Sequence, residues 1–247
     1  MNTPEPDICA TIPRKQLIAE LLILVGIICL PTIFDLFTSW FKLYSGDSGG
    51  VGFVFSGFAY LTEISLILYL IWSGGESFSQ FGFRKPLPSD LLWAIPLILI
   101  PFGLGLLINH FTRYPTRISN APPWAMHSTV AMYSRFALFP IIPRFFYLLF
   151  NLISALLLRE LFFRSYLIVR LEQIGWKTGW AVILSTILYA FGPIVFDPVA
   201  LSVLAVMGLL FSLYFAKFRR IWPLVIAHFV LNLIPLIDLY HWTKAIA

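Results

Sequence analysis

The chain has 247 residues, of which 59% are hydrophobic and only 12% are charged. Soluble domains carry roughly 25% charged residues, so the composition excludes an ordinary soluble enzyme and indicates an integral membrane protein. The net charge of +5 does not indicate nucleic-acid binding, because excess lysine and arginine in a membrane protein mainly set its orientation.

The apolar runs predict an all-α fold, a polytopic bundle of about seven transmembrane helices. In chain order, the predicted spans are residues 16–40, 51–72, 91–109, 136–168, 179–196, 199–218 and 222–239. The fourth run is too long for one straight span and contains Pro140, Pro143 and Arg144. We therefore expect it to consist of a short interfacial segment followed by a tilted helix.

The distribution of lysine and arginine predicts the orientation. If the N-terminus is cytoplasmic, most of these residues fall on the inner side of the membrane, as membrane proteins prefer. We therefore predict that residues 1–15 form a cytoplasmic tail and that residues 16–247 form a single transmembrane domain. The expected location is a bacterial plasma membrane or an equivalent internal membrane, and the sequence leaves the oligomeric state open.

Two stretches place polar groups deep inside apolar segments. Glu160 and Arg164 are four residues apart and share one helix face, and His228 and Asn232 repeat this spacing near the end of the chain. A charge at the centre of a bilayer costs at least about 2.5 kcal/mol, so such residues usually face a bundle interior or a wet cavity. Taken alone, each pair is also explained by an internal ion pair or by hydrogen bonds between helices.

Together, the two pairs suggest chemistry. A carboxylate and an imidazole in one pocket can handle a water molecule and its protons, while a histidine or asparagine can donate to a developing oxyanion. These are the groups that a hydrolase inside a membrane needs. A catalytic zinc needs three protein ligands, which the sequence does not group, so we expect neither a metal nor a cofactor.

These residues resemble the signature of the CAAX protease and bacteriocin-processing (CPBP, or Abi) family of glutamate-type intramembrane proteases. That signature consists of Glu-Glu-x-x-x-Arg, Phe-x-x-x-His and His-x-x-x-Asn/Asp. The first part resembles residues 159–164, the third resembles residues 228–232, and Phe-Gly-Phe-Arg-Lys-Pro at 81–86 is similar to a stretch common between early helices of the family. The resemblance implies a CPBP-like core at about 135–240 and, as partners, membrane lipid and membrane-embedded or lipidated peptides.

The chain also departs from the family pattern. Arg159 stands where the family has the glutamate that activates water, and Tyr189 and Pro193 stand where the second motif has its phenylalanine and histidine. Arginine cannot act as a general base, and proline has no side-chain donor or acceptor. Glu160 lies one residue later, about 100° around a regular helix. A local π-bulge could re-aim it, although no feature of the sequence indicates one.

Two functions therefore remain open. The chain is either an intramembrane endopeptidase, with Glu160 as the base and with His228 and Asn232 binding the oxyanion, or a catalytically inactive pseudoprotease. In the second case it would serve as an assembly, immunity or partner-binding factor. In both cases Arg159, Arg164 and Tyr189 are expected to form a substrate-binding or structural polar pocket. A small transporter is disfavoured because no broken helices recur in matching halves.

Overall fold

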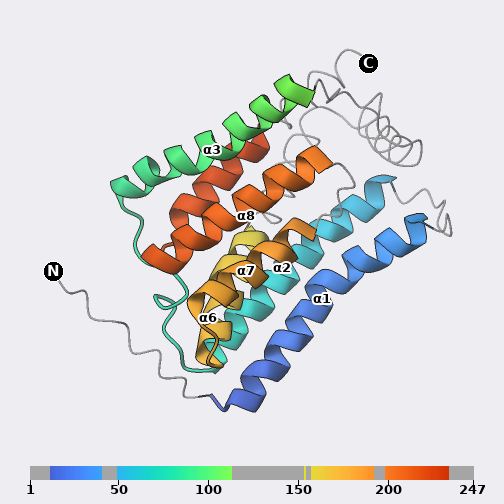
Figure 1. Cartoon of the computed structure of the whole chain (residues 1–247). Helices are drawn as coiled ribbons and strands as arrows, with labels where there is room; N and C mark the ends of the chain where they lie inside the picture. Colours follow the sequence, from blue (N-terminus) through green and yellow to red (C-terminus); the bar gives the residue numbers. More distant parts are fainter. Residues whose placement is uncertain (1–11, 41–48, 113–152, 154–156, 192–197, 234–247) are drawn as a thin grey trace.

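The computed structural model of the chain describes residues 12–40, 49–112, 153, 157–191 and 198–233. Within these ranges the chain forms helices and no strand. The helices are α1 (Arg14–Trp40), α2 (Gly49–Ser73), α3 (Pro88–Thr112), η2 (Glu160–Tyr166), α6 (Leu167–Gln173), α7 (Thr178–Phe191) and α8 (Pro198–Phe218), followed by a helix at Trp222–Leu233, here called the His228 helix (Figure 1).

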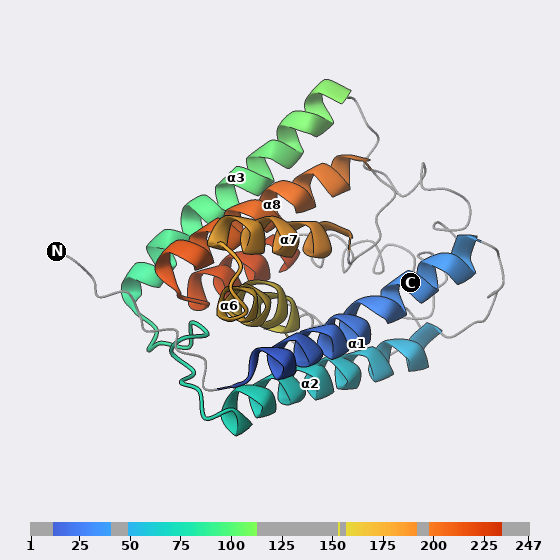
Figure 2. The same cartoon turned by 60° about the horizontal axis from the view of Figure 1, so that its bottom comes forward.

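The helix formed by η2 and α6 lies at the centre of the bundle. η2 contacts α2, α7 and α8, while α6 contacts α1 and α7. Two views of the chain show α1 and α2 on one side of this central helix, and α7, α8 and α3 on the other side (Figures 1 and 2). A helix covered by neighbours on all sides can carry polar groups away from lipid, and this is where the predicted site residues lie.

The described helices coincide with six of the predicted spans. Two stretches, Pro88–Ile108 and Leu201–Phe218, are long and apolar enough to cross a membrane, and the apolar stretches Phe58–Ser73, Thr178–Ala190 and Trp222–Leu233 are shorter. The described residues therefore bear out a helical protein with membrane-type segments, whereas seven full spans remain a prediction. The expected interfacial segment before residue 144 lies outside the described residues.

Candidate active site

Glu160–Tyr166 (η2) is a π-helix inside a continuous helix that runs from residue 157 to residue 173. The N–H of Leu167 donates to the carbonyl oxygen of Phe162, five residues back, instead of four as in an α-helix. All seven residues of η2 are buried. Because a π-turn holds more residues than an α-turn, it changes the directions in which the side chains point, starting at Glu160.

Buried serine side chains connect the π-helix to neighbouring segments. The Ser185 hydroxyl on α7 donates to the carbonyl oxygen of Phe163 at 2.7 Å and lies 3.0 Å from the Ser212 hydroxyl on α8. The Ser165 hydroxyl donates to the carbonyl oxygen of Phe81 at 2.5 Å. All three serines are fully buried. The Ser185 bond supplies a donor to a carbonyl where the regular α-helical ladder is interrupted, and the Ser165 bond ties the π-helix to the segment before α3.

The π-helix brings Glu160 into contact with His228. Nδ1 of His228 lies 2.6 Å from Oε1 of Glu160, and both side chains are buried although they are 68 residues apart in sequence. Because a carboxylate can only accept, Nδ1 carries the proton in this pair. A neutral imidazole then keeps its lone pair on Nε2, the ring nitrogen that can accept a proton from another group.

Arg164 and Tyr189 complete the buried cluster. Nε of Arg164 lies 3.5 Å from Oε2 of Glu160. The guanidinium carbon lies 3.6 Å from the centroid of the Tyr189 ring, a close cation–π contact. The Tyr189 ring in turn meets the His228 ring edge-on, with 6.2 Å between centroids. Four of the six residues singled out from the sequence thus lie together.

The other two residues are placed differently. Asn232 is half-buried, and its side-chain N–H donates to the backbone oxygen of His228, one turn back in the same helix, at 3.1 Å. Arg159 is partly exposed, and the ion pair of Glu160 is with Arg164 and not with Arg159 among the described contacts. Pro193 lies outside the described residues. Within those residues, no three His, Cys, Asp or Glu side chains group as a metal site.

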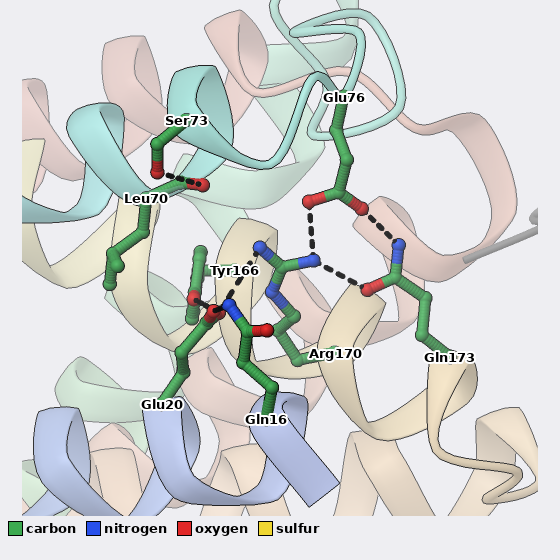
Figure 3. Close-up of polar contacts among 8 residues, drawn as sticks. All are labelled: Gln16, Glu20, Leu70, Ser73, Glu76, Tyr166, Arg170 and Gln173. Atoms are coloured by element: carbon green, nitrogen blue, oxygen red, sulfur yellow. Dashed lines mark hydrogen bonds and ion pairs between the residues drawn. The ribbon is translucent and has the colours of Figure 1, made fainter. Parts of the chain in front are cut away.

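A second buried polar cluster surrounds Arg170, which the sequence did not single out as a site residue. Arg170 is fully buried and contacts Glu76 at 2.5 Å, Gln173 at 2.8 Å and Glu20 at 3.5 Å (Figure 3). The Tyr166 hydroxyl also donates to Glu20, at 2.9 Å. These groups come from η2, α6, α1 and the segment after α2. Each of these residues lies near the end of an apolar run, at the end predicted to face the cytoplasm. Polar residues gathered at the same predicted end of several runs are a sequence signal that could have indicated this cluster.

The loop between α2 and α3 contacts both the π-helix and the start of the His228 helix. The Trp222 indole, at the start of the His228 helix, donates to the backbone oxygen of Arg84 at 2.6 Å. Arg220 donates to the backbone oxygen of Lys85 in this loop at 2.9 Å, and it forms a two-pronged ion pair with Asp90, in the first turn of α3, at 2.6 and 2.7 Å. Together with the Ser165 bond to the same loop, these contacts fix η2 and the His228 helix to one segment, the one that includes the family-like stretch at 81–86.

Apolar helices around a buried carboxylate, guanidinium and imidazole define a helical membrane protein with a polar centre. The sequence model of the family described as Rce1-like, type II CAAX prenyl endopeptidase, matches residues 141–234. This segment holds all six predicted site residues, and its similarity to that family agrees with the motif resemblance. Comparisons with curated proteins and with solved structures found no match.

Proposed function

We propose that this protein is an intramembrane endopeptidase that cleaves membrane-associated or lipid-modified peptides, with its N-terminus on the cytoplasmic side. The observation that carries the proposal is the buried contact of 2.6 Å between Nδ1 of His228 and Oε1 of Glu160. A carboxylate that fixes one nitrogen of an imidazole makes the other nitrogen a positioned general base. The similarity of residues 141–234 to a family of CAAX-type peptidases supports the same class of reaction.

The contacts favour His228 over Glu160 as the proton acceptor. Both oxygens of Glu160 already face cationic or donor groups, Oε1 toward His228 and Oε2 toward Arg164. In the proposed reaction, Nε2 of His228 takes a proton from water while the water oxygen bonds to the peptide carbonyl carbon. Glu160 stabilises the resulting imidazolium. The imidazolium then returns the proton to the amide nitrogen as the C–N bond breaks.

Two groups are proposed to stabilise the oxyanion of the tetrahedral intermediate. The Arg164 guanidinium lies beside Glu160, and the Asn232 amide has a second N–H besides the one bonded to His228. Donors of this kind typically contribute a factor of about 10² to 10³ in rate when they meet the developing charge directly.

A second candidate function is binding without cleavage, as in a pseudoprotease. The observation that favours it is Arg159, a cation at the motif position where the family has its water-activating glutamate. Arginine cannot accept a proton from water at neutral pH. In this case the buried cluster would recognise a membrane peptide or protein partner, and the protein would act in assembly or immunity.

Protein termini in whole membranes separate the two candidates. Cells with the wild-type chain would be compared with cells that carry a Glu160→Gln, His228→Ala double variant at matched expression. His110→Ala serves as the control, because His110 is exposed at the end of α3. New N- or C-termini that appear with the wild type and the control, but not with the double variant, are expected and would identify the cleaved bond.

The opposite result would overturn the peptidase proposal. If all three samples had the same termini, and intact membrane proteins co-purified with the wild type but not with the double variant, the cluster would bind and not cut. A further variant would strengthen that reading. If Arg159→Glu combined with Pro193→His created cleavage in a silent protein, the two departures from the family pattern would be the cause of the silence.

A further inference from the structure

The guanidinium of Arg164 is an unusual buried cation. Arg164 is fully buried, yet among the described residues none of its three guanidinium nitrogens has a hydrogen-bond partner. The nearest carboxylate oxygen, Oε2 of Glu160, is 3.5 Å from Nε and also lacks a hydrogen bond there. A buried charged donor left without acceptors is costly, so a group that supplies acceptors to it would be strongly favoured.

The surroundings of Arg164 restrict where such a group can lie. One face of the guanidinium is covered by the Tyr189 ring at 3.6 Å, and the Phe211 ring is 5.7 Å from the guanidinium carbon. The faces of these rings offer no strong acceptor in the plane of the guanidinium, where its N–H groups point. The nitrogens Nη1 and Nη2 therefore present a planar fork, which matches the two oxygens of a carboxylate.

The charge balance of the cluster also favours an anion. Arg159 and Arg164 bring two positive charges against the single negative charge of Glu160, and the neutral His228 adds no charge. Arg159 is close enough to act electrostatically on Glu160, His228 and Tyr189. One added negative charge would neutralise the surplus, and in a medium of low polarity such neutralisation is worth more than in water.

We propose that Arg164, supported by Arg159, is a binding site for one carboxylate group of a molecule bound beside His228. This inference deepens the proposed function, since the bound molecule would be the peptide product, whose new carboxylate arises from the oxyanion that Arg164 is proposed to stabilise. A carboxylate fits better than a lipid phosphate, because the fork is fully buried among aromatic side chains.

The test uses small probes and measures binding, not cleavage. Dodecanoyl-leucine, its amide, dodecanoate and dodecyl phosphate would be titrated against the full-length protein in detergent micelles, with correction for uptake by empty micelles. The wild type is expected to bind dodecanoyl-leucine about tenfold or more tightly than its amide, the size of a lost charge-assisted hydrogen bond. A peptide end as the natural source predicts tighter binding of dodecanoyl-leucine than of dodecanoate, and a fatty acid predicts the reverse.

Variants locate the effect. The measured quantity is the ratio of the affinity for dodecanoyl-leucine to the affinity for its amide. This ratio is expected to fall toward one in Arg164→Gln, to fall partly in Arg164→Lys, and to fall less in Arg159→Gln. Lys217→Gln, at an exposed lysine on α8, should keep the full ratio. The comparison of acid and amide in the wild type needs no variant, so it decides the matter even if Arg164→Gln does not fold.

Three results would overturn the inference: no preference for acid over amide in the wild type, including no binding of either probe; a preference that survives Arg164→Gln; or tighter binding of dodecyl phosphate than of both carboxylates. None of these results bears on cleavage, which the comparison of termini measures separately. A peptidase without a carboxylate site, and a carboxylate site without a peptidase, are therefore distinguishable.

Discussion

Replacing Gly82 with alanine tests the loop between α2 and α3, which contacts both η2 and the His228 helix. Gly82 has φ +84°, in the left-handed region, and a Cβ there would lie 2.7 Å from Cε2 of Phe215 and 3.2 Å from the backbone nitrogen of Ile221. Phe215 is fully buried and has little room to move. The left-handed conformation costs about 1–2 kcal/mol for alanine, and the steric overlap adds about 1–3 kcal/mol. We expect Gly82→Ala to lower the free energy of unfolding by about 2–5 kcal/mol.

Gly75→Ala is the matched control, because Gly75 also has a positive φ, +68°, but a Cβ there would meet nothing within 4 Å. Alanine at Gly75 therefore pays only the conformational cost of about 1–2 kcal/mol, partly offset by a less flexible unfolded chain. Both variants would be unfolded by dodecyl sulfate titration in mixed micelles and followed by tryptophan fluorescence. The difference between them isolates the close approach of the loop to α8.

Equal losses in the two variants would refute the reasoning, because they would mean that Gly82 is glycine only for its φ angle. A second readout connects the loop to the site. The backbone N–H of Ile221 donates to the carbonyl oxygen of Gly82 at 3.2 Å. Ile221 directly precedes the His228 helix. We expect the ¹⁵N resonances of the His228 ring to shift in Gly82→Ala and to stay unchanged in Gly75→Ala.

The same titration checks two further predictions. Ser185→Ala removes a buried donor to η2 and should lower the free energy of unfolding by about 1–3 kcal/mol. Thr186→Ala is the control and should lower it less, because the Thr186 hydroxyl bonds within its own helix. Equal losses in the two variants would argue against serine support of the π-helix. Arg220→Ala leaves the Asp90 carboxylate, 2% exposed, without its two-pronged partner and should cost about 1.5–3 kcal/mol. Lys217→Ala should have little effect, and a similar loss there would contradict a specific role for the Arg220 ion pair.

Much of the helical layout follows from the sequence alone. Long apolar runs predict helices because backbone polar groups in a membrane must be satisfied within the segment. Six predicted runs coincide with described helices, and the polar pairs Glu160–Arg164 and His228–Asn232 were visible as charges and amides in apolar surroundings. The resemblance to a family followed from the spacing of these residues, and the match over residues 141–234 agrees with it. Local composition and spacing suffice for such inferences.

The contacts within the site depended on the tertiary structure. Glu160 begins a π-helix whose contacts run to distant parts of the chain. Its Ser165 donates to the carbonyl oxygen of Phe81, 84 residues away, and its Phe163 carbonyl accepts from Ser185, 22 residues away. The cluster around Arg170 likewise joins α1, α6 and the segment after α2 (Figure 3). Periodicity along one segment reports which residues are buried, but the geometry of a π-turn and the partner of a buried charge are decided by the neighbours that pack against them.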